Sequence, residues 1–248
     1  MGNFFSFAKY DNDDKNKKVD KVVKPKIYKI IFYKNKNIVI SKNTSNDETK
    51  IIDLNILEKY FIQRDIESFL IKPCFNLICE NLKITKIVNY PFYLLSINCS
   101  NNMIKNLDDL PENISILNCS KNYILRLDDL PISMEELDCS YNYLTQLENL
   151  PHNLIRLNCA NNKLVNLNNL PPNLIYLNCS NNKLVNLNNL PSSIIYLDCS
   201  HNNFNELVNY NFQSLTCDYK FKNINQIKLN FDKITSVQKG VIKMEKFN

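Results

Sequence analysis

The stretch "LPPNLIYLNCSNNKLVNLNN" at residues 170–189 is followed directly by a second version of itself, "LPSSIIYLDCSHNNFNELVN", at residues 190–209. The same unit runs back through the chain, because seven cysteines and six prolines each recur at steps of 20 residues. These residues are Cys79, Cys99, Cys119, Cys139, Cys159, Cys179 and Cys199, with Pro91, Pro111, Pro131, Pro151, Pro171 and Pro191. A period this short is typical of one supersecondary unit per repeat, stacked into a solenoid.

The spacing of apolar residues within one copy predicts a short strand. Leu154, Leu157 and Cys159 are apolar and polar residues lie between them, which suits a strand with one buried face. One strand per copy makes a parallel sheet. About 20 residues leave no room for a full helix on the return path, so that side should be extended or irregular and should start at Pro. Leu164, Leu167 and Leu170 are expected to line the far wall of the core.

The repeated pattern resembles that of a known family. "LxxLxCSxNxLxxL", as in Leu174, Leu177, Cys179, Asn182, Leu184 and Leu187, is similar to the leucine-rich repeat, with cysteine in the third apolar slot. The resemblance covers six full copies from about Pro91 to Tyr210, and the short period and recurring "LP" look like the bacterial-type subclass. Heavy use of Asn, Ile and Lys indicates an AT-rich genome, such as those of large amoeba-infecting DNA viruses.

The resemblance implies an α/β or mainly β fold. It implies a leucine-rich-repeat solenoid with a short-strand parallel sheet on the concave face, an extended or irregular convex side, and mixed α/β caps. Caps are needed because a single repeat cannot bury its own apolar face. We therefore expect a flexible N-terminal segment at 1–24, an N-terminal cap of a hairpin plus a helix at 25–70, the solenoid at 71–218, and a C-terminal cap with a strand and a helix at 219–248.

Two columns of identical residues are expected to be structural. Asparagine recurs where each strand turns inward, and a short amide can satisfy both the N–H and the C=O groups that are buried there. These residues are Asn102, Asn122, Asn142, Asn162, Asn182 and Asn202. The cysteines contain no CxxC pair and stack in line along the sheet, so we expect core packing and no metal site. Only two glycines are present, which leaves no glycine-rich loop for a nucleotide cofactor, and we expect no cofactor.

Function is expected in solvent-facing columns that change from copy to copy. Exposed Tyr and Arg on a rigid sheet anchor protein interfaces, so we predict contacts to an unidentified protein partner on the concave face. The predicted contact residues are Glu136, Arg156, Tyr176, Tyr196 and Tyr141. An equally weighted alternative is that these aromatic side chains only pack along the sheet. The column Asn98, Asn118, Asp138, Asn158, Asn178 and Asp198 is also expected to face solvent.

Other functional classes are less favoured. The "DCSH" run at 198–201 has the letters of a hydrolase, but a strand alternates its side chains whereas a catalytic triad needs them to converge. We therefore expect no enzyme. A role as substrate adaptor for ubiquitin ligation stays an alternative. The net charge of +5 is spread over mixed signs, so no nucleic-acid partner is expected.

The first residues, "MGNFFS", match the pattern for myristoylation of Gly2. Alternatively, Phe4, Phe5 and Phe7 pack against the N-terminal cap. One acyl chain gives only marginal membrane binding, so a second signal would be required at a membrane surface. The sequence has no stretch of about 20 apolar residues and no secretory leader. Nine cysteines are expected as thiols in a reducing compartment, which predicts a cytoplasmic protein with membrane association through Gly2 as an added expectation.

Overall fold

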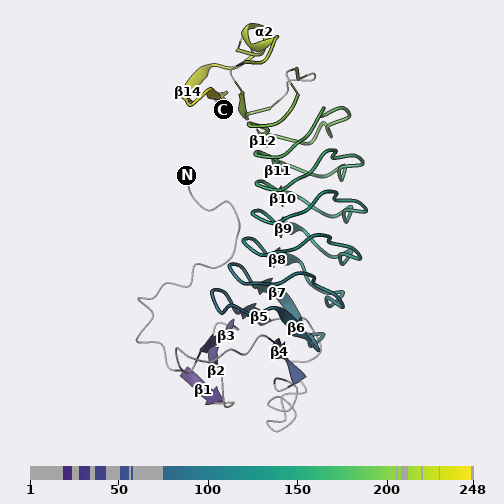
Figure 1. Cartoon of the computed structure of the whole chain (residues 1–248), viewed down its shortest axis with the longest axis vertical. Helices are drawn as coiled ribbons and strands as arrows, with labels where there is room; N and C mark the ends of the chain where they lie inside the picture. The colour runs from purple at the N-terminus through teal and green to yellow at the C-terminus, as the bar shows by residue number, and fades with distance from the viewer. Residues whose placement is uncertain are drawn as a thin grey trace. The chain divides into compact units, whose positions relative to one another are not determined.

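The computed structural model describes residues 19–23, 28–33, 37–42, 51–55, 57, 75–204, 206–207, 212–218, 220–228 and 230–246. The chain divides into two compact units, Met1–Tyr123 (unit 1) and Ile124–Asn248 (unit 2). Both units are mainly β and carry one short parallel strand in each 20-residue turn, followed by an irregular return path (Figure 1). The expected fold class, a leucine-rich-repeat solenoid, is confirmed.

Unit 1 contains an antiparallel region followed by parallel strands. Its main sheet has the order β1 (Val19–Val23), β2 (Tyr28–Tyr33), β3 (Asn37–Lys42), β5 (Phe75–Ile78), β7 (Leu94–Asn98) and β8 (Ile116–Asn118). Strands β1 to β3 pair antiparallel, and from β3 onward the pairing is parallel. A second sheet joins β4 (Ile51–Asp53) to β6 (Lys86–Val88) in parallel.

Several described strands lie within the two N-terminal segments expected from the sequence, 1–24 and 25–70. Strands β2 and β3 pair antiparallel within residues 25–70, the segment in which a hairpin is expected. Strand β1 lies inside the segment expected to be flexible and pairs with β2. Most of the helix expected within residues 25–70 lies outside the described residues, and so does Gly2.

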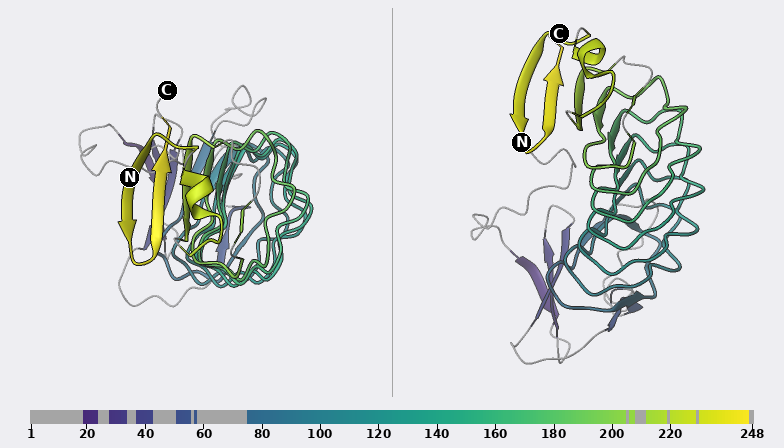
Figure 2. Two further views of the ribbon diagram at one scale, coloured as in Figure 1. Left: turned by 90° about the horizontal axis from the view of Figure 1, so that it is seen from above. Right: turned by 45° about the horizontal axis from the view of Figure 1, so that its top comes forward.

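Unit 2 contains five parallel strands and an antiparallel end. The parallel strands are β9 (Glu136–Asp138), β10 (Arg156–Asn158), β11 (Tyr176–Asn178), β12 (Tyr196–Asp198) and β13 (Ser214–Asp218). After a short helix, α2 (Ile224–Lys228), the chain adds β14 (Lys233–Gln238) and β15 (Val241–Glu245). Strand β15 pairs antiparallel with both β13 and β14, so β14 is the last strand of this sheet (Figure 2).

Each turn of unit 2 begins with a bend at proline. The N–H of Leu154 donates to the carbonyl of Pro151 at 3.0 Å, and the N–H of Leu174 donates to the carbonyl of Pro171 at 3.1 Å. Proline suits this position because the bend uses its carbonyl and requires no N–H from it. The apolar residue that ends the bend then starts the strand segment and enters the core.

Further bends use residues in the left-handed conformation, which recurs in two columns of the repeat. The first column has φ between 53° and 57° at Asn101, Lys121, Tyr141, Asn161, Asn181 and His201. The second has φ between 52° and 60° at Asp109, Asp129, Asn149, Asn169 and Asn189. Asn and Asp tolerate this conformation better than other side chains with a Cβ atom. The chain therefore makes its recurrent bends without glycine.

The core is filled as the apolar spacing predicts. Leu154, Leu157, Cys159 and Leu164 are fully buried, and Leu167 is 4% exposed. The strand side chains form one wall of the core and the leucines of the return path form the other. No helix in the described part of the chain is long and apolar enough to cross a membrane.

The cysteine column belongs to this core. All eight described cysteines are free thiols and are buried. Burial raises the pKa of the Cys99 thiol to about 12, although a backbone hydrogen bond opposes the shift. The thiols therefore stay protonated near neutral pH and pack as small apolar groups. In the described residues no group of three or more His, Cys, Asp or Glu side chains could hold a metal ion.

Candidate protein-binding surface

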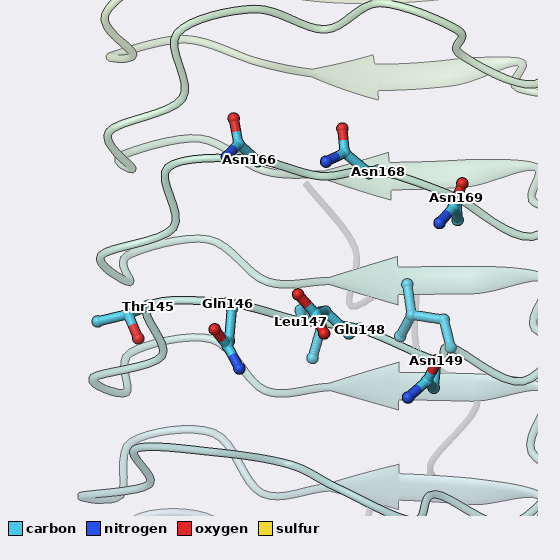
Figure 3. Close-up of a pocket in the computed structure, with 9 residues that line it drawn as sticks. Thr145, Gln146, Leu147, Glu148, Asn149, Asn166, Asn168 and Asn169 are labelled. Carbon is cyan, nitrogen blue, oxygen red and sulfur yellow. The ribbon is translucent and has the colours of Figure 1, made fainter.

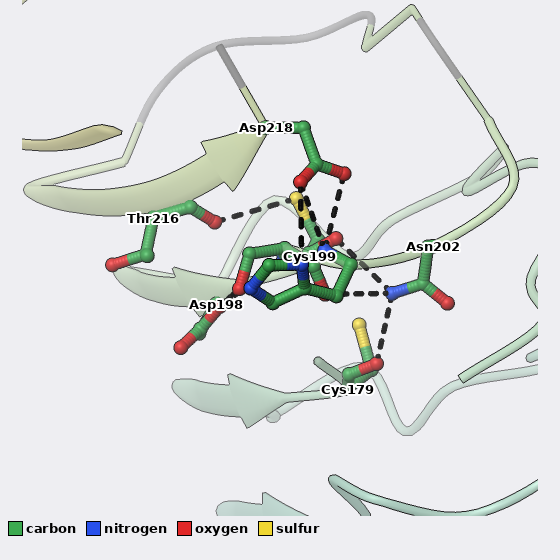
Figure 4. A network of polar contacts seen from close by, with 8 residues as sticks. Cys179, Asp198, Cys199, Asn202, Thr216 and Asp218 are labelled. Atoms are coloured by element: carbon green, nitrogen blue, oxygen red, sulfur yellow. Dashed lines mark hydrogen bonds and ion pairs between the residues drawn. The ribbon is translucent and has the colours of Figure 1, made fainter. Parts of the chain in front are cut away.

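The asparagine column, called here the asparagine ladder, has its hydrogen-bonding groups occupied by the fold. The Asn182 amide nitrogen donates to the carbonyls of Cys159 and Cys179 at 3.0 Å each and of Ser180 at 3.3 Å. Its Oδ1 accepts the N–H of Leu164 at 3.0 Å. Figure 4 shows the same arrangement at Asn202, whose amide nitrogen donates to the carbonyls of Cys179 and Cys199. The structural interpretation of this column is confirmed.

The column that includes Asp138 and Asn178 was expected to face solvent. Its side chains instead accept hydrogen bonds from the residue two positions later in the same chain. Asn178 Oδ1 accepts the N–H of Ser180 at 3.1 Å and its hydroxyl at 2.7 Å. Asp138 makes the same two contacts with Ser140 and is only 9% exposed. These are Asx turns that end each strand, and they compete with contacts to a partner. The expectation that this column is free to face solvent is therefore wrong for Asp138, and the other members are half-buried.

Four of the predicted contact residues lie side by side on unit 2. Glu136, Arg156, Tyr176 and Tyr196 begin successive strands and are register neighbours, each of them half-buried. The Arg156 guanidinium carbon lies 4.9 Å from the centroid of the Tyr176 ring, which is the geometry of a cation–π contact. Burial raises the pKa of the Tyr176 phenol, and the nearby Asp198 adds to the shift. Tyr176 therefore presents a neutral hydroxyl and an aromatic ring.

A neighbouring apolar column was not singled out in the sequence. Ile155, Ile175 and Ile195 each precede the Arg or Tyr residue, and Ile175 is 36% exposed while the other two are half-buried. The backbone N–H of Ile175 donates to the carbonyl of Ile155, and that of Ile195 donates to the carbonyl of Ile175, both at 2.9 Å. The signal was present as the doublets in "LIRL", "LIYL" and "IIYL", since the first residue of each doublet already fills the core.

These two columns form one surface on adjacent strands of unit 2, which we call the sheet patch. It consists of Ile155, Arg156, Ile175, Tyr176, Ile195 and Tyr196. Glu136 lies at its β9 end, in register with Arg156. Partly exposed aliphatic and aromatic groups around one guanidinium are the composition of an interface core.

Tyr141 does not join the sheet patch. It lies beyond the end of β9 in the left-handed conformation, with φ of 55°, and its side chain is 54% exposed. Its backbone N–H donates to the carbonyl of Ala160 at 2.9 Å. Nearby, the Lys163 ammonium lies 4.7 Å from the centroid of the Tyr143 ring. Tyr141 therefore occupies a bend position beside a second aromatic and basic group.

The return side of unit 2 contains a polar hollow of about 500 Å³ between two turns. Figure 3 shows Asn166, Asn168 and Asn169 on one turn and residues 145–149 on the turn beside it. The lining side chains are mostly neutral, and Glu148 is the one ionisable residue among them. The hollow offers hydrogen bonds but no pair of groups suited to acid–base chemistry.

The hydrolase-like run at 198–201 does not form a catalytic triad. The Ser200 hydroxyl donates to Asp198 Oδ1 at 2.7 Å and Ser200 is 4% exposed. The His201 ring instead lies toward Asp218, with Nδ1 3.8 Å from Oδ1, and the His201 N–H donates to both Asp218 oxygens at 3.1 Å. Desolvation raises the pKa of Asp198. The serine hydroxyl donates to a carboxylate and not to the imidazole, so the Ser–His contact that a catalytic triad requires is not formed by these residues.

Comparison with known proteins finds no matching family model and no matching curated protein. Among solved structures, the leucine-rich effector YopM from Yersinia pestis is similar, with 33% identity and a TM-score of 0.54 over 58% of this chain and 42% of that chain. A Shigella effector LRR domain has 25% identity and a TM-score of 0.49, over 52% of this chain and 70% of that chain. The functional domain of InlJ from Listeria monocytogenes, described as including a cysteine ladder, has 30% identity and a TM-score of 0.44, over 54% of this chain and 36% of that chain.

The likeness to YopM supports the leucine-rich-repeat fold found above. This chain spans less than half of the YopM chain. Solenoids of this kind are typically binding scaffolds, because stacked repeats create extended surfaces whose outward residues can vary while the core stays the same. The fold therefore indicates a protein-interaction module in general.

Proposed function

We propose that the protein binds a protein partner through the sheet patch of unit 2, on the face expected to be concave. The observation that carries this proposal is the in-register column Arg156, Tyr176 and Tyr196 beside a second column of isoleucines. Tyr and Arg are the side chains most enriched among residues that dominate binding energy, and the isoleucines add apolar area around them. The partner is expected to cover this area with apolar side chains and to place an acceptor at Arg156.

The rigidity of the patch supports this proposal. Successive strands are joined by backbone hydrogen bonds of 2.8 to 3.2 Å, as between Ile175 and Ile155, and the asparagine ladder secures the turns behind them. A surface that is ordered before binding loses little conformational entropy when a partner docks. The patch is thus suited to be a preorganised contact surface.

A protein fits the charges better than a nucleic acid does. Residues 124–204 contain four Lys or Arg side chains against seven Asp or Glu side chains. A nucleic-acid interface depends on a concentrated excess of positive charge, so the acidic balance of this stretch favours a protein. The proposed role is binding without catalysis.

The experiment compares the full chain with the double variant Tyr176→Ala/Tyr196→Ala in affinity purification from cells that express each. We expect a stoichiometric protein partner with the unchanged chain and its loss with the variant. The matched control is Asn168→Ala/Asn188→Ala, two exposed residues of the return side, which should keep the partner. Equal recovery of the partner by all three proteins, each with an unchanged circular dichroism spectrum, would contradict the proposal.

We also propose that the protein acts in the cytoplasm and is recruited to a membrane through a myristoylated Gly2. Support comes from the "MGNFFS" pattern and from the eight free, buried thiols, which suit a reducing compartment. The test is the intact mass and membrane fractionation of the chain and of Gly2→Ala, both made in eukaryotic cells. A myristate mass and membrane sedimentation that Gly2→Ala abolishes are expected, and an unmodified soluble chain would contradict this proposal.

A further inference from the structure

Strand β14 is an open edge of the unit 2 sheet. It pairs with β15 on one side and is the last strand in the sheet order, with no further strand beyond it in the described part of the chain (Figure 2). Five of its six residues are exposed, and only Thr235 is half-buried. An open edge presents backbone N–H and C=O groups that can pair with another strand.

The edge also carries uncovered apolar side chains. A register shift between Ile234 and Ser236 places Ile234 opposite Met244 and Val237 opposite Ile242. Met244 and Ile242 are fully buried, so Ile234 and Val237 belong to the same apolar face of the hairpin. Nevertheless they are 49% and 54% exposed. The apolar face of the hairpin thus continues from β15, whose side chains are buried in the core, onto β14, where they are exposed.

We propose that β14 pairs antiparallel with β14 of a second copy of this chain, so that the chain forms a symmetric dimer. The sequence of the edge is self-complementary about a two-fold axis between Thr235 and Ser236. In that register Ile234 faces Val237 of the second copy, and Val237 faces Ile234. β-Branched cross-strand pairs of this kind stabilise antiparallel sheets.

The charges agree with the same register. Lys233 faces the neutral Gln238 of the second copy. Asp232 directly precedes β14 and Lys239 lies in the turn directly after it, so this register brings Asp232 of one copy near Lys239 of the second copy at both ends. Asp232, Lys233 and Lys239 are all exposed. A lysine on an edge strand normally discourages pairing. Here no like charges meet, because the only lysine within β14 faces an amide, so the edge favours its own copy over a strand of arbitrary sequence.

The pairing buries a small area compared with a standard interface, since it uses one strand and two apolar side chains per copy. The dimer should therefore be weak and should depend on protein concentration. It uses residues 232–239 and none of the sheet patch, so it is independent of the partner proposed above.

The test is sedimentation velocity of the full chain over a wide range of concentration. We expect a shift from monomer to dimer as the concentration rises. Asp232→Lys and Lys239→Asp should each raise the dimer dissociation constant about tenfold, because each puts two like-charged pairs into the dimer. An equimolar mixture of the two variants should recover the affinity of the unchanged chain, since each variant then supplies the charge that the other lacks.

Two controls keep the outcome interpretable. Lys222→Asp makes the same charge change at an exposed residue outside β14 and should leave the dimer intact, as should Tyr176→Ala/Tyr196→Ala. Val237→Lys should abolish the dimer without a change in circular dichroism. A chain that stays monomeric at every concentration, or a dimer that neither Val237→Lys nor the charge variants weaken, would overturn the proposal.

Discussion

The side-chain oxygen of Asn182 accepts the backbone N–H of Leu164 at 3.0 Å, across 18 residues of chain. The same amide donates to the carbonyl of Cys159 in the preceding turn and to that of Cys179 in its own. One side chain thus joins two successive turns at a buried point. The solenoid therefore depends on the amide group itself and not only on a polar residue.

Replacing Asn182 by Asp tests this dependence because the two side chains have the same shape. The carboxylate would point an acceptor at three carbonyl oxygens, so we expect the free energy of unfolding to fall by about 3 kcal/mol. Urea unfolding followed by circular dichroism measures the change. Asn168→Asp, the same substitution at an exposed residue, should change it by less than about 0.5 kcal/mol. Equal effects of the two variants would show that the ladder is dispensable.

The left-handed bend at Tyr141 predicts a stabilising substitution. Asn occupies the equivalent position in the two following turns, Asn161 and Asn181, with nearly the same φ. Since Asn adopts this conformation at lower cost than Tyr, Tyr141→Asn should raise the free energy of unfolding by about 1 kcal/mol. Asn181→Tyr should lower it by a similar amount. Thermal unfolding of both variants checks the sign, and a loss of stability in Tyr141→Asn would mean that the ring contributes packing that outweighs the bend.

Tyr90 in unit 1 holds a position that is leucine in later copies, such as Leu150 and Leu170. Its hydroxyl oxygen is enclosed and has no hydrogen-bond partner in the described residues. Burial, with smaller effects from Cys99 and Cys79, raises the pKa of this phenol well above its usual range. Tyr90→Phe removes the enclosed hydroxyl and keeps the ring, so we expect the free energy of unfolding to rise by about 1 kcal/mol. If urea unfolding instead shows a lower free energy of unfolding for Tyr90→Phe, the hydroxyl must have a hydrogen-bond partner in solution.

The cysteine column predicts loss of stability at alkaline pH. Burial raises the pKa of the thiols in the folded state, to about 12 for Cys99 and for Cys217, while an unfolded thiol ionises near its usual pKa of about 8.5. A raised folded-state pKa means that the unfolded chain loses its protons first as the pH rises. The stabilisation is therefore complete below about pH 8 and is lost between about pH 9 and pH 12, by up to about 1.4 kcal/mol per pH unit for each thiol.

Thermal unfolding across this pH range measures that loss, and Cys179→Ala should make the decline less steep. Thiol labelling at neutral pH gives a second readout, because buried and protonated thiols should react only after the protein unfolds. Rapid labelling of the native protein at Cys159 or Cys179 would contradict the assignment of these residues to the core.

The sequence predicted the core and the ladder because a solenoid repeats one local environment. When Leu154, Leu157 and Cys159 recur at a step of 20 residues, each copy must bury the same face, so spacing alone assigns these side chains to the interior. The asparagine ladder could be predicted for a related reason, since a polar side chain repeated at an inward bend has to satisfy backbone groups there.

The sequence also predicted that Arg156, Tyr176 and Tyr196 share a column, because in-register parallel strands place equivalent residues side by side. It placed Tyr141 beyond the strand but did not predict the left-handed bend there. Tyr141 lies at a left-handed bend, and its exposure follows from that backbone conformation. Asn or Gly at a position indicates a left-handed residue, whereas Tyr gives no such signal.

Tertiary structure alone decided which polar residues remain available and where the sheet ends. His201 faces Asp218 rather than Ser200, and that contact depends on how one turn stacks on the next. Asp138 is buried and bonds to Ser140 in an Asx turn within its own copy of the repeat. The edge is open because β14 is the last strand of the sheet in the described residues, and a register shift brings Ile234 and Val237 to one face of it. The period thus determined which residues are buried in each turn. The partner of His201 depended on a contact between turns, which no single copy of the repeat contains, and the exposure of β14 depended on its place at the end of the sheet.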